Sequence, residues 1–411
     1  GILFHHLMAQ EGDPYLLPSL YSFASREAVE RFVQTVQVVI NRHDILRTAV
    51  LWEGLAQPVQ VVLRQATLAL EELHFDADAQ ADVATQLQAQ LDPQQHRIAL
   101  NRAPLLRLHL AHDKAHGRWL LHILAHHLVT DHTTTDLLIQ EAELIEQGRQ
   151  AELAAPMPFR NFVAQARLGT SAAQHEAFFR EMLADVTEPT APFGLLDVRG
   201  DTAELDEARL ALSPAQARAV REQTRRLGIG AASLMHLAWG LVLARSTGRQ
   251  DVVFGTLLLG RMQAGADADR VMGVFINTLP LRLQLAGLGV EQALRQTHQL
   301  LARLLAHEHA PLSLAQRCSG VEAPAPLFSA LLNYRHSASA AVGMDTPVAP
   351  ADADRIQQLS VHERTNYPFV LSVDDLGEGF MLTAQVQKTV GAERVCAFMH
   401  QAVQALLDGL A

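Results

Sequence analysis

The chain has 411 residues, 49% of them hydrophobic, and carries a formal net charge of −11. This length can bury a sizeable core in two domains, and the negative charge argues against a general nucleic-acid binder. Two distant cysteines, Cys318 and Cys396, suggest neither a disulfide framework nor a cysteine-based zinc site and fit a reducing cytoplasm. No apolar run reaches the roughly 18 to 20 residues that cross a bilayer, so we expect a cytoplasmic protein without a membrane segment.

The first half of the chain alternates between helical and strand patterns. It opens in an apolar segment without an initiator methionine, so we expect a piece of a longer polypeptide. Residues 27–42 place apolar side chains on one helical face behind Ser25, a plausible cap. A helix capped near Thr133 is predicted over residues 136–147. Strands are predicted over residues 45–52 and 58–63, which form a hairpin, and over residues 105–112 and 118–126.

The second half repeats this mixture of helices and strands. An almost wholly apolar helix over residues 231–245 should be buried around Trp239. Further helices are predicted over residues 159–183, 214–227 and 393–407, and strands over residues 208–212, 252–258, 279–283, 327–333, 367–372 and 380–386. We therefore predict an α/β fold of the α+β kind in two lobes, residues 1–168 and 169–411, with a cleft between the lobes as the default place for a large ligand.

Residues 126–132, with the sequence HHLVTDH, place three imidazoles and one carboxylate on a strand-to-helix connection. A metal site is disfavoured, because His126 and His127 are neighbours in a strand and point to opposite faces. A network of satisfied structural histidines stays open as an alternative. Acyl transfer is favoured, because the pKa of an imidazole lies near neutrality and suits proton transfer. We predict no metal at this cluster.

Several motifs then point to one family. Its active-site pattern, two histidines, three residues and Asp-Gly, is matched by His126, His127 and Asp131, with His132 in place of glycine. Residues 42–48 (RHDILRT), 272–282 (MGVFINTLPLR) and 364–369 (RTNYPF) resemble its early arginine motif, its floor-loop and arginine motif, and its late motif. The whole chain thus resembles the condensation domain of nonribosomal peptide synthetases, and the motifs together are specific. The family's first motif would precede Gly1.

The resemblance implies a fold and a set of partners. Two chloramphenicol acetyltransferase-like lobes would form a V-shaped pseudo-dimer with a tunnel between them. Upstream (donor) and downstream (acceptor) peptidyl carrier domains would deliver thioesters on phosphopantetheine arms, beside an adenylation domain of the same polypeptide, with no cofactor bound directly. Holding both substrates in line can lower the barrier by up to about 7 to 11 kcal/mol.

The resemblance also implies roles for the histidine motif. His127 is expected to face the tunnel and either accept the proton of the attacking amine or stabilise the tetrahedral species. His126 would point the other way as structural support. Asp131 is expected to pair with Arg282 and to hold the loop, so that its loss would damage folding as well as rate.

A second histidine pair suggests the subclass. His5 and His6 precede Gly12 and Asp13 at a spacing similar to the extra histidine motif of dual epimerization/condensation domains, which invert the last donor residue before joining it. An isolated pair could merely end a strand and hydrogen-bond locally, but the Gly-Asp spacing and His132 favour the dual interpretation. We expect His127 to serve one face of the donor Cα, and His6 or Asp13 to shape or supply the other.

Two further residues are weaker candidates for the site, and three other classes of protein stay open. Asn333 could hold the incoming amine through its amide, or be a strand-end turn residue, and Ser372 could border the tunnel. An ordinary condensation domain is the main alternative, and a silent carrier-docking platform is a second. A glycerolipid acyltransferase is also conceivable, since His126 and Asp131 fit its His, four residues, Asp pattern, but the missing membrane segment and the whole-chain resemblance argue against it.

Overall fold

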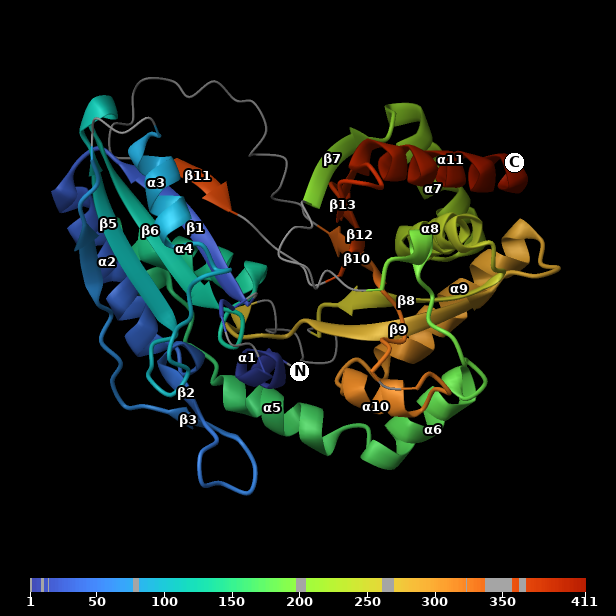
Figure 1. Cartoon of the computed structure of the whole chain (residues 1–411), viewed down its shortest axis with the longest axis horizontal. Helices are drawn as coiled ribbons and strands as arrows, with labels where there is room; N and C mark the ends of the chain where they lie inside the picture. Colours follow the sequence, from blue (N-terminus) through green and yellow to red (C-terminus); the bar gives the residue numbers. More distant parts are fainter. Residues whose placement is uncertain are drawn as a thin grey trace. The chain divides into compact units, whose positions relative to one another are not determined.

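The computed structural model describes residues 2–8, 11–13, 15–76, 81–196, 205–260, 270–322, 324–336, 357–361 and 367–411. The chain forms two compact units, whose elements are labelled in Figure 1. Unit 1 comprises Gly1–Ala166, Arg261–Phe275 and Val348–Arg364, and unit 2 comprises Arg167–Gly260, Ile276–Pro347 and Thr365–Ala411. The units therefore differ from the two consecutive lobes predicted from the sequence, because two later segments belong to unit 1.

Unit 1 is built on a five-stranded sheet with the order β11-β1-β6-β5-β4. Neighbouring strands are antiparallel, except that β4 and β5 are parallel. A separate hairpin, β2 and β3, confirms the hairpin expected from the sequence. The strands are β1 (Leu16–Phe23), β2 (Thr48–Leu51), β3 (Val59–Val62), β4 (Leu70–Leu73), β5 (Leu106–Asp113), β6 (Arg118–His126) and β11 (Gln357–Val361).

The helices of unit 1 begin where the local sequence supplies a cap. The Ser25 side chain accepts a hydrogen bond from the Ala28 amide and starts α2 as predicted. The helix α4 begins earlier than predicted, because Asp131 rather than Thr133 caps it by accepting from the Thr134 amide. α2 packs against α4, β1 and β6, whereas α3 packs against β5 and β6. The helices are α1 (Ile2–Met8), α2 (Arg26–Arg42), α3 (Val83–Gln90), α4 (His132–Glu146) and α5 (Phe159–Leu168).

Unit 2 is built on a six-stranded sheet with the order β7-β13-β12-β10-β8-β9. The helix predicted to be buried is α8, in which Trp239 is fully buried and stacks on Phe369 with ring centroids 5.2 Å apart. The strands are β7 (Leu205–Ala211), β8 (Asp251–Leu258), β9 (Asn277–Gln284), β10 (Ala330–His336), β12 (Phe369–Asp375) and β13 (Phe380–Gln387). The helices are α6 (Ala172–Leu183), α7 (Pro214–Leu227), α8 (Ala231–Thr247), α9 (Val290–Leu305), α10 (Leu312–Arg317) and α11 (Ala392–Leu410).

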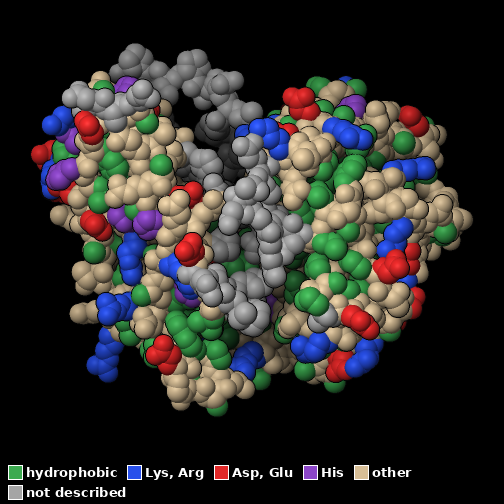
Figure 2. All heavy atoms as spheres, in the orientation of Figure 1, with side chains coloured by type: hydrophobic (Ala, Val, Ile, Leu, Met, Phe, Trp, Pro, Cys, Tyr) green, Lys and Arg blue, Asp and Glu red, His purple; other side chains and the backbone are tan. Residues whose placement is uncertain are grey.

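Two surface properties bear on the functional classes considered above. Within the described ranges, no single helix has the length and apolarity to cross a membrane, and the pair α7 and α8 reaches them only together, across a bend of 110°. On the face drawn in Figure 2, acidic and basic side chains are interspersed over both units.

Candidate active site

The two histidines of the HHLVTDH segment lie at the end of β6, where the strand meets α4. The His126 amide donates to the Leu105 carbonyl at 3.0 Å, and the His127 amide donates to the Tyr15 carbonyl at 2.9 Å. Backbone on both sides therefore fixes this end of the strand. The predicted strand-to-helix connection is confirmed, and it presents both imidazoles from a rigid position.

His126 is fully buried, and its hydrogen bonds determine which ring nitrogen carries the proton. The Leu128 amide donates to His126 Nδ1 at 3.0 Å, so Nδ1 holds a lone pair. His126 Nε2 therefore carries the hydrogen and donates to Asp13 Oδ2 at 3.0 Å. Both ring nitrogens of His126 are therefore engaged in structural hydrogen bonds.

Asp13 is the centre of the cluster, with a fully buried side chain. Its Oδ2 lies 2.5 Å from His6 Nδ1 and 3.0 Å from His126 Nε2, and its Oδ1 accepts from the Tyr15 amide at 3.0 Å. Burial by itself raises the pKa of Asp13, but the hydrogen bonds from His126, His6 and Tyr15 outweigh it and bring the pKa to about 2. The carboxylate is therefore ionised at neutral pH.

His6 is a buried imidazole oriented by this carboxylate. Burial lowers the pKa of His6, although the hydrogen bond to Asp13 opposes that effect, so the ring is neutral at pH 7. With Nδ1–H donated to Asp13, the lone pair lies on Nε2, for which the described residues supply no hydrogen-bond partner. A carboxylate behind an imidazole is the arrangement that prepares a general base.

The loop before Ile98 supports the Gly-Asp half of the motif. Gly12 has a φ of +66°, and a Cβ there would lie 2.2 Å from the Gln94 carbonyl oxygen. The Asp13 amide donates to the Pro93 carbonyl at 2.7 Å. The glycine is therefore required by both its backbone conformation and this close approach. This loop could not be predicted from the sequence, because nothing in its spacing connects it to the histidines.

His127 is oriented by its own loop. Its Nδ1 donates to the Thr130 carbonyl at 3.0 Å, because a carbonyl can only accept. In the neutral ring the lone pair is then on Nε2, which is the form that can accept a proton. His127 is only partly buried, in contrast to His126.

Asp131 holds the start of α4 and ties it to the segment before Phe275. Its Oδ1 accepts from the Thr134 amide at 2.8 Å and lies 2.7 Å from Thr134 Oγ1, and its Oδ2 accepts from the Phe275 amide at 3.4 Å. Thr134 Oγ1 in turn accepts from the Gly273 amide at 2.9 Å. Asp131 is thus a structural residue of unit 1.

Arg282, which was expected to pair with Asp131, is held by two carboxylates of its own unit. Arg282 Nη2 lies 2.6 Å from Asp251 Oδ2, and Nη1 lies 2.5 Å from Asp185 Oδ1, all within unit 2. The pairing of β8 with β9 places Arg282 opposite Val253, two residues from Asp251 along β8, so the guanidinium reaches that carboxylate. The hydrogen bonds that Arg282 donates to Asp251 and then to Asp185 hold the pKa of Arg282 well above its usual range.

The hydrogen bonds that Asp131 accepts predict the effect of Asp131→Ala. We expect the free energy of unfolding to fall by about 2 to 4 kcal/mol, because an N-cap is worth about 1 kcal/mol and a buried donor without an acceptor costs about 1 to 3 kcal/mol. Asp131→Asn keeps Oδ1 as an acceptor and should lose about half as much. Urea unfolding of both variants checks this, and an unchanged midpoint for Asp131→Ala would contradict it.

The early arginine motif also has a structural role in unit 1. Arg42 Nε donates to Glu141 Oε2 at 3.0 Å, and His43 Nε2 lies 3.0 Å from both oxygens of the same carboxylate. Asp44 Oδ1 accepts from the Phe159 amide at 2.9 Å. The motif thus joins α2 to α4 and to the start of α5 through Glu141, a residue that no sequence motif pointed to.

The two weaker candidates lie together in unit 2. Asn333 and Ser372 are directly opposite in the parallel pair β10 and β12, so their side chains share one face of the sheet. Asn333 Oδ1 is buried without a hydrogen-bond partner in the described part of the chain. Both side chains are half-buried.

The side chains of five predicted positions cannot be placed. His5 lies in α1 and His132 is the first residue of α4, but their side chains lie outside the described residues. Of the late motif, residues 364–366 also lie outside the described residues.

The cluster of His6, Asp13 and His126 also brings three possible metal ligands together, because one ligand atom of each residue lies within 4.8 Å of the others. Its separations of 2.5 and 3.0 Å, however, are those of hydrogen bonds to one shared carboxylate oxygen. A metal ion would have to displace the ring protons that both imidazoles donate to Asp13. The arrangement therefore fits proton transfer as it stands.

The ionised Asp13 orients the neutral imidazole of His6, and His127, the neighbour of His126 in the chain, carries a lone pair on Nε2 in its neutral form; both features fit proton transfer on a mixed α/β scaffold. A family model of the condensation domain matches residues 1–410, and the chain belongs to that family. It is 48% identical over 410 residues, the whole chain, to malpinin synthetase and malpibaldin synthetase from Mortierella alpina. The chain spans only 5% and 7% of those two proteins.

Solved structures agree with this assignment at the level of the fold. The starter condensation domain of rhizomide synthetase superposes with a TM-score of 0.71 at 20% identity, covering 99% of this chain and 93% of that one. The first condensation domain of the calcium-dependent antibiotic synthetase, in complex with a substrate analogue, gives 0.70 at 17% identity, covering 100% and 94%. The predicted α/β fold is thereby confirmed. The chain is a condensation domain of the nonribosomal peptide synthetase type, a family that forms peptide bonds.

Proposed function

We propose that this chain inverts the last residue of a carrier-bound donor peptide from L to D and then joins it to an acceptor aminoacyl thioester. One observation carries the proposal: a buried, ionised Asp13 links His6 of the amino-terminal motif to His126 of the HHLVTDH segment. A pair of histidines with only a local role would not need this connection. An ordinary condensation domain would use His127 alone.

In the condensation step, the acceptor amine attacks the donor thioester carbonyl. His127 Nε2 accepts the amine proton, or the protonated ring stabilises the tetrahedral species by donating a hydrogen bond to it. The Nδ1–H of His127 is held by the Thr130 carbonyl throughout. The carbon–nitrogen bond forms, the carbon–sulfur bond breaks, and the proton passes to the leaving thiolate. His127 is therefore a catalytic residue of the proposed reaction.

In the epimerization step, a proton leaves the Cα that the thioester has made acidic. His6 Nε2 is suited to accept it, because Asp13 orients the ring and stabilises the imidazolium that forms. A proton must then be returned to the opposite face, which we assign to His127. His126 links the two histidines. Its Nε2–H donates to Asp13, and its Nδ1 accepts from the amide of Leu128, the residue after His127.

The partners follow from the same proposal. Upstream and downstream peptidyl carrier domains present the two thioesters on phosphopantetheine arms, and an adenylation domain of the same polypeptide loads the acceptor. No cofactor needs to bind this chain directly. Asn333 and Ser372 are proposed substrate contacts, because the buried amide oxygen of Asn333 can accept a hydrogen bond from an amine.

The test is a reconstituted reaction with the flanking carrier domains, an all-L donor and an acceptor aminoacyl thioester, followed by chiral analysis. A product with an inverted donor residue supports the dual function. An all-L product leaves an ordinary condensation domain. If no product forms although the carriers are competent, a silent docking platform is favoured. The presence of both His127 and Asp131 argues against that outcome.

His6→Ala separates the two steps. We expect it to slow the loss of deuterium from the donor Cα by at least about 100-fold, while a donor supplied with the D residue is still condensed. Asp13→Asn should act in the same direction, because it removes the charge behind the ring. His74→Ala, at an exposed position, is the matched control. Deuterium loss in His6→Ala at the wild-type rate would remove His6 from the chemistry.

A further inference from the structure

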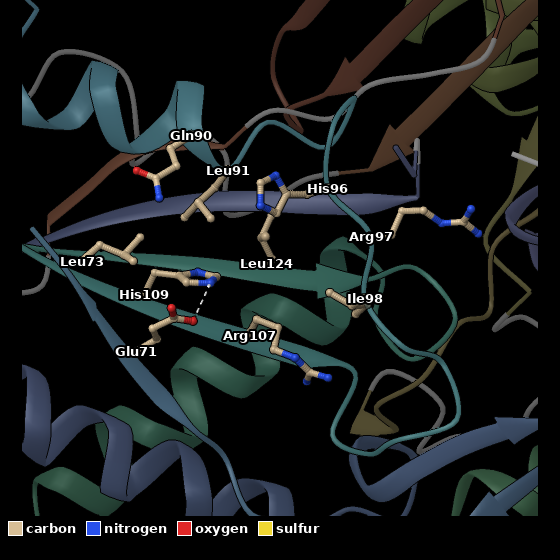
Figure 3. A pocket seen from close by; sticks show the side chains of 10 residues that line it. All are labelled: Glu71, Leu73, Gln90, Leu91, His96, Arg97, Ile98, Arg107, His109 and Leu124. Atoms are coloured by element: carbon tan, nitrogen blue, oxygen red, sulfur yellow. Dashed lines mark ion pairs between the residues drawn. The ribbon is translucent and has the colours of Figure 1, made fainter. Parts of the chain in front are cut away.

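We propose that a pocket on unit 1, whose lining includes neither Asp13 nor His126, binds an oxyanion of the phosphate class. The cavity has a volume of about 260 Å³ and lies between β4, β5, the end of α3 and the loop that follows it. Figure 3 shows side chains that line this cavity: His109 and Arg107 from β5, Glu71 from β4, and His96 from the loop after α3. Figure 2 shows several histidine side chains on the drawn face of unit 1, with basic and acidic side chains among them.

Arg107 provides the positive charge. It is half-buried, and its Nη1 donates to the Pro104 and Leu106 carbonyls at 2.8 Å each, but no carboxylate of the described residues pairs with it. Burial and then the neighbouring Arg102 lower the pKa of Arg107, and Glu71, the acidic residue of the cavity lining, pairs with His109 and forms no ion pair with Arg107 among the described residues. A partly buried guanidinium without an acid is stabilised by a bound anion, which it can hold through two N–H groups.

Two imidazoles provide further donors. The Nδ1 atoms of His96 and His109 are buried without a hydrogen-bond partner among the described residues. His109 is 7% exposed and shares a sheet face with Arg107, two residues away on β5. Burial lowers the pKa of His109, Glu71 opposes this, and His96 and Arg107 reinforce it. An anion would satisfy the unpaired nitrogens, since each can carry a hydrogen in the right tautomer.

Glu71 is the one acidic group among the residues that line the cavity. Its carboxylate is 69% exposed and lies 4.0 Å from His109 Nε2. Because the carboxylate is at the rim and largely in water, it can turn away when an anion enters. It should nevertheless weaken anion binding by repulsion, which gives a substitution with the opposite sign to the loss of Arg107.

Phosphate is favoured over a carboxylate, because it offers more negative charge and more acceptor oxygens to the guanidinium of Arg107 and to a neighbouring ring N–H. The source is either free phosphate or the phosphodiester of a phosphopantetheine arm, and only the second source rests on the proposed function. The same loop touches the catalytic motif, because Arg97, next to His96, donates to the His6 carbonyl.

The experiment titrates the intact chain by calorimetry with inorganic phosphate, phosphopantetheine and pantetheine at constant ionic strength, without carriers or turnover. Phosphate should bind, and Arg107→Gln should weaken it at least about tenfold, because a charged hydrogen bond is lost. Glu71→Gln should tighten binding, and this exposed variant serves if Arg107→Gln does not fold. Arg209→Gln, exposed in unit 2, is the matched control and should not change binding.

Two comparisons decide the source and the fate of the proposal. Tighter binding of phosphopantetheine than of phosphate assigns the pocket to the arm, and equal binding assigns it to free phosphate. The proposal is overturned if phosphate does not bind, if Arg107→Gln responds as the wild type does, or if pantetheine binds as well as phosphopantetheine. A failure of the proposed epimerization would leave all these binding results unchanged.

Discussion

His127→Ala should lower the rate of peptide-bond formation by about 100- to 10,000-fold, the usual contribution of one general acid or base. The hydrogen bond from Nδ1 to the Thr130 carbonyl places the lone pair of the neutral ring on Nε2, so the ring is ready to accept a proton without a change of tautomer. His127→Gln should restore little, because an amide cannot take up a proton in this range of pH.

Single-turnover assays with loaded carriers measure this effect without interference from product release. His74→Ala is the matched control, because it removes an exposed imidazole from the same unit. If His127→Ala keeps more than about a tenth of the wild-type rate, positioning of the two thioesters accounts for most of the catalysis, since effective molarity alone can supply about 7 to 11 kcal/mol. His127 would then not be the catalytic base.

Elements with strong local periodicity could be predicted from the sequence. α2 shows an apolar face with a serine cap, and α8 is apolar around its whole circumference, so both were identified with nearly correct ends. β1 was missed, because it carries Pro18 and its buried residues form a near-continuous run rather than an alternation. β11 was missed because it joins this sheet through pairing with β1, which lies more than 300 residues away in the chain.

The same distinction between local and distant contacts applies to the site. Spacing alone identified the histidines and Asp131, and the local turn explains why Asp131 caps α4. The link from Asp13 to His126 joins residues 113 positions apart, so no spacing rule predicts it. The ion pair of Arg282 with Asp251 could not be predicted for the same reason, because it depends on the register of β8 with β9, which is set by the sheet.

Gly12→Ala should be the most damaging substitution outside the histidines. A left-handed residue other than glycine costs about 1 to 2 kcal/mol, and here the new Cβ would also lie 2.2 Å from the Gln94 carbonyl oxygen, so backbone has to move. We expect a loss of unfolding free energy of about 3 kcal/mol or more, since overpacking adds about 1 to 3 kcal/mol. Because Asp13 is the next residue, the His6–Asp13 hydrogen bond should be lost first.

Gly117→Ala is the matched control, because Gly117 has a similar φ of +62° with nothing within 4 Å of the new Cβ. It should cost only the backbone term of about 1 to 2 kcal/mol. Urea unfolding of the two variants isolates the clash as their difference. In the folded fraction of Gly12→Ala, the rate of deuterium loss from the donor Cα should fall more than the rate of condensation of a D-configured donor. The backbone movement at residue 12 displaces Asp13 and His6 rather than His127. Equal stability of the two variants would mean that the Gln94 loop yields freely and does not fix the carboxylate that orients His6.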